Sequence, residues 1–463
     1  MARKIEARIG NFDIVFTNER ILPVTGLALV GRFIAESQLE RRADVLKLDK
    51  RPEPMIKNSD VLKTYIGILA QGRTDYECVR ELREDVAFSQ EALGLSGRLP
   101  CEATLRQRMD QIGDKLRYAI LRCNTDMFTA GQIRPTANRQ GYVPLDVDVS
   151  PFDNSGTKKE GVSRTYKGCD GYAPIFAYVG TEGYLANCEL REGKQHCQKG
   201  TSDFLWESIQ CARAIAGTDA KLLLRMDAGN DSAENYGVCA DAGVAYLVKR
   251  NLRREKPETW QLGALIMQCY DKETVHVMHP REGKTVYRGS IDRILAVPHA
   301  NGRTTEERVR VVYEVIERSV LANGQMLLMP DLEVNTWHTS LSLPEDDVIA
   351  LYHAHAECEQ YHSELKTDMG MERLPSGKFA TNALVLELAM LAYNLLRMMG
   401  QESLRYPGTP ARHVVRRKRI RTVIEHIMRI AAHLTTHARR RCLGLGRSNA
   451  WRQAFAHVCR QFA

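Results

Sequence analysis

Residues 349–366 read IALYHAHAECEQYHSELK, a segment without Pro or Gly in which Ala, Leu, Glu, His and Lys dominate. This composition predicts one helix. Tyr352, His355, Glu359 and Lys366 follow one another at offsets of three, four and seven residues, so they share one helix face. A face with a phenol, an imidazole, a carboxylate and an ammonium differs from a core face. It indicates either a functional site or an ordinary surface helix.

Two upstream aspartate motifs favour the functional site, because each ends an apolar run that predicts a strand. In LDVDVS (145–150), Asp146 and Asp148 point to the same strand face, so both are candidates. In LLLRMDAGND (222–231), Asp227 follows the apolar run directly. Carboxylates are the ligands that Mg²⁺ and Mn²⁺ prefer. Two such ions, about 3.5–4 Å apart, activate a water or a 3′-hydroxyl in phosphoryl displacement and stabilise the leaving oxygen.

The bulk composition is that of a soluble globular protein. A chain of 463 residues with 44% hydrophobic and 26% charged residues predicts two to four domains. The first residues, MARKIEARIG, lack the apolar region of a signal peptide. The apolar segment 383–400 contains Glu387, Asn394 and Arg397, which indicates a buried core helix rather than a membrane span. Twelve scattered cysteines without a CxxC pair indicate reduced thiols and a cytoplasmic protein.

Positive charge is concentrated at the carboxyl-terminal end. The net charge is +8, but residues 403–463 hold 14 Lys and Arg against one acidic residue, Glu425. This imbalance predicts a polyanionic partner, with nucleic acid favoured over an anionic membrane surface. The densest basic cluster alternates with an apolar helical stripe and comprises Arg416, Arg417, Lys418 and Arg419.

The order of segments predicts a mixed α/β fold. Helical spacing dominates to about residue 124, and β-type runs begin near Gly141. Three strands, a helix and another strand follow, which is the order of a ribonuclease-H-like sheet, although this order is common in α+β proteins. We expect such a catalytic core with flanking parts: a mainly helical N-terminal DNA-binding domain (1–135), the first part of the core (136–250), a β-rich insertion of short β segments separated by charged turns (251–345), the last part of the core with the Glu359 helix (346–402) and a basic helical C-terminal region (403–463).

The predicted helix also carries a recognisable spacing. Tyr352, Glu359 and Lys366 match Tyr-x2-Arg-x3-Glu-x6-Lys, with His355 in place of Arg. LDVDVS resembles a first-Asp motif, in which Asp148 is the better match, and RMDAGND resembles a second-Asp motif. With these three motifs the chain resembles bacterial insertion-sequence transposases of the DDE type. The resemblance covers roughly residues 140–400, and in this family too a β-rich insertion precedes the Glu.

The resemblance implies an enzyme that cuts the ends of a transposable element and joins the 3′-hydroxyls to target DNA. It implies that Asp148, Asp227 and Glu359 hold Mg²⁺ or Mn²⁺ as two ions, and that Tyr352 and Lys366 contact DNA. The N-terminal helices would bind terminal inverted repeats, and a homodimer would act on paired ends. No membrane is implied, and the protein would be nucleoid-associated in the bacterial cytoplasm.

Further DNA contacts are expected from basic side chains. These candidates are Arg225, Lys249, His355, Arg416, Arg417, Lys418 and Arg419. Because imidazole is shorter than guanidinium and cannot grip a phosphate bidentately, His355 either keeps a weaker phosphate contact or impairs the site. Two alternatives stay open: a related nuclease that cuts without joining, and a transposase-derived DNA-binding protein with an impaired site.

Overall fold

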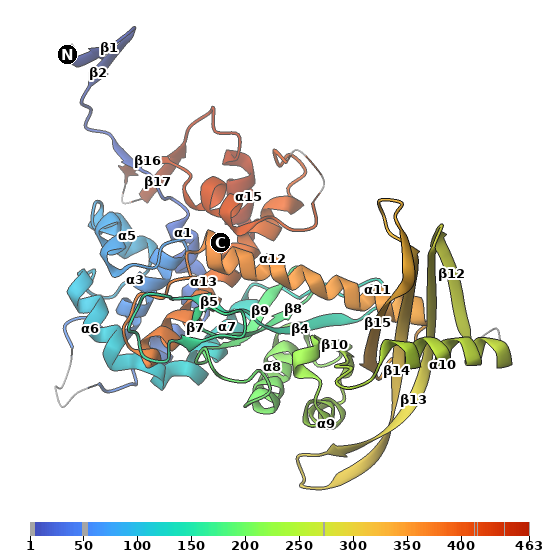
Figure 1. The fold of residues 1–463 in the computed structure, drawn as a ribbon. Coiled ribbons are helices and arrows are strands. Elements are labelled where there is room, and N and C mark those ends of the chain that lie inside the picture. The colour runs from blue at the N-terminus through green and yellow to red at the C-terminus, as the bar shows by residue number, and fades with distance from the viewer. Residues whose placement is uncertain are drawn as a thin grey trace.

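The computed structural model describes residues 5–48, 54–271, 274–411, 413, 415–438 and 440–462. Within these ranges the largest sheet has nine strands, in the order β12-β13-β14-β15-β11-β10-β4-β8-β9 (Figure 1). Its central strands are β4 (Val143–Val149), β8 (Ile175–Val179), β9 (Tyr184–Glu189), β10 (Leu222–Met226) and β11 (Ala245–Lys249). The mixed α/β fold with a large central sheet is therefore confirmed.

The central strands combine parallel and antiparallel pairs. Strand β4 runs parallel to β10, and β10 runs parallel to β11. Strand β8 is antiparallel to both β4 and β9. Helices α8 (Thr201–Ala216) and α9 (Ala233–Ala242) lie on one face, and α11 (Glu345–His353), α12 (Cys358–Ser363) and α13 (Phe379–Arg405) lie on the other (Figure 1). Because helices cover both faces, β8 and β10 are buried along their whole length.

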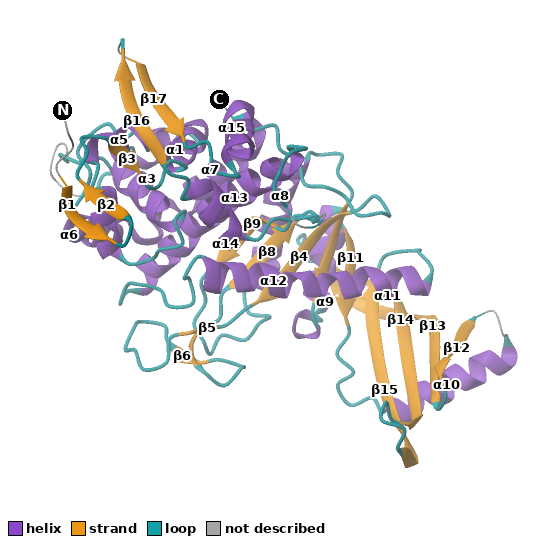
Figure 2. Ribbon diagram, turned by 90° about the horizontal axis from the view of Figure 1, so that it is seen from above, coloured by secondary structure: helices purple, strands orange, loops and turns teal. Residues whose placement is uncertain are grey.

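The β-rich insertion extends the central sheet. Its strands are β12 (Val275–Arg281), β13 (Lys284–Pro298), β14 (Thr304–Val320) and β15 (Met326–Thr339). Strand β15 pairs antiparallel with β11, from Leu247 opposite Thr339 to Lys249 opposite Trp337. Helix α10 (Pro257–Tyr270) packs against these strands (Figure 2).

The prediction of short β segments in this insertion was wrong. Strands β13 and β14 contain 15 and 17 residues, and two of the expected segments form the single strand β13. Charged residues that suggested turns instead pair across neighbouring strands. The Arg288 Nη2 lies 2.6 Å from Glu314 Oε2, and the Arg308 Nη2 lies 2.7 Å from Asp292 Oδ2. Helix α10 was not anticipated from the sequence.

The segment predicted as one helix from residue 349 is continuous but changes pitch. A 3₁₀ turn, Ala354–Glu357, separates α11 from α12, and a π turn, Glu364–Asp368, follows α12. The segment lies across the central strands (Figure 2). Its polar face is divided, because His355 is buried whereas Glu359 is exposed.

The N-terminal helices pack on α13. Beyond the exposed hairpin of β1 (Ile5–Ile9) and β2 (Phe12–Val15), these helices are α1 (Leu27–Glu36), α2 (Leu39–Ala43), α3 (Asn58–Leu69), α4 (Val79–Leu82), α5 (Val86–Ala92), α6 (Glu102–Ile112) and α7 (Arg117–Ala130). One hydrophobic core joins them to the central sheet, α13 and the C-terminal segments. Helix α13 is long and apolar enough for a membrane span, but 83% of its most apolar 18-residue window is buried inside the protein. This burial is typical of a core helix.

The C-terminal region is only partly helical. Helices α14 (Ile420–Val423) and α15 (Arg452–Gln461) flank a hairpin of β16 (Ala432–His437) and β17 (Arg440–Leu445). The expectation of a helical C-terminal region is therefore wrong for Ala432–His437, which forms a strand instead. In β16 the buried Ala432 and Leu434 alternate with exposed residues, and the strand pairs with β3 (Arg20–Leu22), a partner that the local sequence does not reveal.

Two smaller features complete the fold. The short strands β5 (Phe152–Asp153), β6 (Ser163–Arg164) and β7 (Asp170–Tyr172) form a small sheet beyond the carboxyl end of β4. All twelve cysteines lie in described parts of the chain and are free thiols.

Candidate active site

Asp148 and Asp227 lie side by side at the carboxyl ends of two neighbouring parallel strands. In the register of β4 and β10, Val147 is opposite Met226, so the next step brings Asp148 opposite Asp227. Neighbouring strands are about 4.8 Å apart. Partial desolvation and the negative charge of Asp148 raise the pKa of the Asp227 carboxyl above its ordinary value. A cation between two such carboxylates would relieve their mutual repulsion.

Two hydrogen bonds fix the Asp148 carboxylate. Its Oδ2 lies 3.1 Å from His362 Nε2, and its Oδ1 accepts a 2.7 Å hydrogen bond from the backbone N–H of Val149. Although desolvation opposes it, the hydrogen bond with His362 lowers the pKa of Asp148, so this carboxyl is ionised at neutral pH. His362 was not predicted from the sequence. Its position seven residues after His355, on the same helix face, was the available signal.

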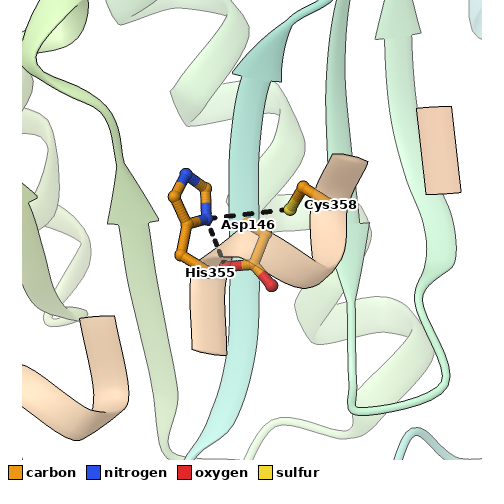
Figure 3. A group of neighbouring side chains, drawn as sticks. All are labelled: Asp146, His355 and Cys358. Atoms are coloured by element: carbon orange, nitrogen blue, oxygen red, sulfur yellow. Dashed lines mark hydrogen bonds and ion pairs between the residues drawn. The ribbon is translucent and has the colours of Figure 1, made fainter. Parts of the chain in front are cut away.

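Asp146, the rival first ligand, is held in a buried ion pair. Its Oδ1 and Oδ2 accept hydrogen bonds from Arg225 Nε and Nη2 at 2.6 and 2.7 Å. His355 Nδ1 lies 2.9 Å from the same Oδ1, as Figure 3 shows. Asp146 is only 1% exposed. Because its oxygens are engaged within the protein, these contacts favour Asp148 as the ligand.

A second potential metal cluster lies beside this ion pair. The ligand atoms of Asp146, His355 and Cys358 all lie within 4.8 Å of one another (Figure 3). The Arg225 guanidinium already neutralises Asp146, and burial raises the pKa of the Cys358 thiol well above its ordinary value. A protonated thiol beside a neutralised carboxylate is a poor ligand set for a hard divalent cation. The donor set of Asp148 and Asp227 suits such a cation better.

Glu359 is exposed on α12 and makes no hydrogen bond or ion pair with any described residue. It lies four residues after the buried His355, and its own side chain is exposed rather than packed against the central strands. Asp148, Asp227 and Glu359 do not form a group whose ligand atoms all lie within 4.8 Å of one another. The structure thus places two of the three predicted carboxylates together, with the third on the helix that covers them.

Tyr352 and Lys366 flank the two aspartates. The Tyr352 ring is half-buried and packs 5.7 Å from the Trp337 ring and 5.8 Å from the His355 ring. Burial and the charges of Asp227 and Asp148 raise its pKa, so it is a neutral phenol. Lys366 Nζ donates a 2.6 Å hydrogen bond to the Pro151 carbonyl, just after β4.

Two predicted DNA contacts lie inside the protein instead. Arg225 is 4% exposed, and its Nη1 also donates a 2.7 Å hydrogen bond to the Leu351 carbonyl. His355 is 8% exposed and bonded to Asp146. Both side chains connect β4 and β10 to the helical segment above them, and their assignment as DNA contacts stays a prediction that these contacts do not favour. Lys249 is half-buried at the end of β11, and its role stays a prediction.

Most of the basic cluster is also engaged within the protein. Arg417 Nη1 lies 2.5 Å from Glu364 Oε1, and Arg419 Nε lies 2.8 Å from Asp368 Oδ2. Lys418 is 5% exposed, with its Nζ 3.2 Å from the centroid of the Trp451 ring. Only the Arg416 side chain of this cluster is exposed without a hydrogen bond or ion pair to another described residue. Arg417 and Arg419 thus attach the C-terminal region to the π turn, and the DNA contacts expected of this cluster stay a prediction.

A cavity of about 1300 Å³ lies elsewhere, lined by residues of α7, α8 and α9 and by Pro298, His299 and Ala300. None of Asp148, Asp227 and Glu359 lines it. The candidate active site at the strand ends is therefore separate from this cavity.

Comparison with known families places the chain in the class of DDE transposases. Residues 10–463 match the family described as transposase DDE domain group 1, and the chain belongs to this family. No curated protein matches the chain. Among solved structures, the chain is similar to piggyBac transposase in a cryo-EM synaptic complex with hairpin DNA, at 11% identity, with 80% of this chain and 74% of that chain covered. The TM-score is 0.37, too low to carry an argument.

Proposed function

We propose that this protein is the DNA transposase of a bacterial insertion sequence, which cleaves the element ends and transfers the strands into target DNA. The adjacent Asp148 and Asp227 at the ends of β4 and β10 carry the proposal, because paired carboxylates at one sheet edge suit divalent cations. Family membership supports it. The order β9-β8-β4-β10-β11, antiparallel and then parallel, supports a ribonuclease-H-like core.

In this proposal Asp148, Asp227 and Glu359 hold Mg²⁺ or Mn²⁺, as two ions. The bound cations would activate the attacking water or hydroxyl and stabilise the leaving oxygen. Asp148 binds as an ionised carboxylate oriented by its hydrogen bonds, and Glu359 approaches from α12 because no protein contact holds it elsewhere. Tyr352, kept neutral by its surroundings, donates its hydroxyl proton in a hydrogen bond to a DNA phosphate.

The proposed partner is double-stranded DNA, both terminal inverted repeats and target, bound by a homodimer on paired ends in the bacterial cytoplasm. Lys249, Lys366 and Arg416 supply positive charge for phosphates, and the net charge of +8 favours association with DNA. The N-terminal helices contact the repeats.

The test is cleavage and joining of a DNA that carries the element ends, with a supercoiled target and Mg²⁺ or Mn²⁺. Joined products support the transposase, whereas cuts without joining support a nuclease and binding alone supports an impaired DNA-binding protein. Asp148→Asn, Asp227→Asn and Glu359→Gln should each lower cleavage by about a thousandfold or more while DNA binding persists.

Glu357→Gln is the matched control for Glu359→Gln, because Glu357 is also exposed on the same helical segment. It should cleave at the wild-type rate. An active Glu359→Gln beside an inactive Glu357→Gln would show that the third ligand is wrongly assigned.

A further inference from the structure

His362 is a buried histidine between the candidate active site and the core. Its side chain is 6% exposed. The ring packs against two aromatic side chains of β8, with centroid distances of 5.2 Å to Phe176 and 5.3 Å to Tyr178. This packing fixes the plane of the imidazole, so its two nitrogens point in defined directions.

Both ring nitrogens have hydrogen-bond partners. Nε2 lies 3.1 Å from Asp148 Oδ2, and Nδ1 lies 3.1 Å from the Tyr178 hydroxyl. An ionised carboxylate only accepts hydrogen bonds, so Nε2 carries a hydrogen. In a neutral imidazole Nδ1 is then an acceptor. Tyr178 is fully buried and burial raises its pKa, so its protonated hydroxyl donates to Nδ1.

The three residues of this chain of hydrogen bonds come from three adjacent elements. Asp148 of β4 lies opposite Phe176 of the antiparallel β8, two residues from Tyr178. His362 reaches both strands from α12. The other Asp148 oxygen accepts from the backbone N–H of Val149. One hydrogen bond to each oxygen holds the carboxylate plane and leaves a lone pair on each oxygen for a ligand.

We propose that His362 is a positioning residue for Asp148: Tyr178 selects the imidazole tautomer that donates from Nε2, and this donor orients the carboxylate for binding a divalent cation. The inference rests on the proposed function, in which Asp148 is a cation ligand. Hydrogen-bond partners of ligating carboxylates typically alter metal affinity 10- to 100-fold when they are removed.

The test measures Mn²⁺ affinity of the full chain without DNA, from the electron paramagnetic resonance signal of free Mn²⁺. His362→Leu fills a similar volume without a donor and should weaken affinity about 10- to 100-fold. His362→Gln carries an amide N–H donor at a similar distance along the side chain and should stay within about threefold of wild type. Tyr178→Phe removes only the hydroxyl and should weaken affinity by about three- to tenfold.

His353→Leu is the matched control, because His353 is an exposed histidine at the end of α11. It should bind Mn²⁺ as the wild type does. Thermal unfolding of each protein without metal separates misfolding from loss of the donor. The key comparison is between the Mn²⁺ affinities of His362→Gln and His362→Leu. If the imidazole had a purely structural role, the smaller amide of Gln would not restore the affinity.

Wild-type affinity in His362→Leu, or equal weakness in His362→Leu and His362→Gln, would overturn the inference. If His362→Leu does not fold, Tyr178→Phe decides, and unchanged Mn²⁺ affinity in that variant overturns it. Asp148→Asn and Asp227→Asn test the underlying function separately. If they bind Mn²⁺ like the wild type, the proposed cation site itself fails, whereas their weakness beside a normal His362→Leu refutes only the role of His362.

Discussion

Replacing Arg225 by methionine should destabilise the fold strongly without a specific effect on DNA binding. The guanidinium makes two hydrogen bonds to Asp146 at 2.6 and 2.7 Å and one to the Leu351 carbonyl at 2.7 Å. Methionine keeps much of the aliphatic stem but leaves Asp146, 1% exposed, with His355 as its remaining side-chain partner. Removing one partner of a buried ion pair costs about 3–5 kcal/mol of unfolding free energy.

Urea unfolding followed by tryptophan fluorescence measures this loss. Trp337 is a suitable probe, because it is 1% exposed and packs in the same apolar cluster as Leu223 and Leu351. The double variant Arg225→Met with Asp146→Leu removes both charges, so it should recover at least half of the lost free energy. Lys221→Met is the control: Lys221 is exposed, directly precedes β10 and should change stability by less than about 0.5 kcal/mol.

Two results would refute this reasoning. Stability of Arg225→Met within about 1 kcal/mol of the wild type would mean that the ion pair contributes little. A tenfold loss of DNA affinity at unchanged stability would restore Arg225 as a DNA contact, the role that the sequence suggested.

Three further predictions follow from buried groups elsewhere. Gly237→Ala should lower the free energy of urea unfolding by several kcal/mol, because the new Cβ would lie 1.9 Å from the Pro298 carbonyl oxygen. The control Gly263→Ala, on α10, meets no atom within 4 Å and should raise the free energy of unfolding by up to about 1 kcal/mol. Equal effects of the two substitutions would contradict this prediction. Burial raises the pKa of Glu387 from 4.5 to about 7, so its contribution to stability is present below pH 4.5 and lost as pH rises towards 7. Glu387→Gln should flatten the pH dependence of unfolding free energy in that window, and an unchanged slope counts against it. Burial lowers the pKa of Lys418 to about 8, so its contribution to folding stability is unfavourable below pH 8, and this penalty disappears as pH rises towards 10.5. Lys418→Met should therefore raise the melting temperature at pH 7 and leave DNA affinity unchanged. A lower melting temperature would show that the contact of Lys418 with Trp451 outweighs the desolvation of its ammonium group.

Sequence patterns predicted what local periodicity and strand order determine. The apolar runs before Asp148 and Asp227 gave two strands, and parallel strands bring residues at their carboxyl ends to one edge of the sheet. The partners of the polar side chains were not predictable in this way. Asp146 and Arg225 are 79 residues apart, and Asp148 and His362 are 214 residues apart, so no local pattern reveals these hydrogen bonds.

The same reason limits what the sequence reveals about the basic region. The sequence shows 14 Lys and Arg after residue 402, but it does not show which acidic residues pair with them. Arg417 and Arg419 bond to Glu364 and Asp368, more than 50 residues earlier. Net charge over a segment therefore overestimates the charge that is available to DNA.

The pairing of β3 with β16 has a consequence for synthesis of the chain. Leu22 lies opposite Ala432, so about 410 residues must be added before this strand finds its partner. At 5–20 residues per second, β3 stays unpaired for roughly 20–80 s before β16 is synthesised. The N-terminal helices can pack early, whereas the small sheet closes only after β16 has been synthesised. A prematurely terminated chain would expose the unpaired edge of β3, which marks it for association or proteolysis.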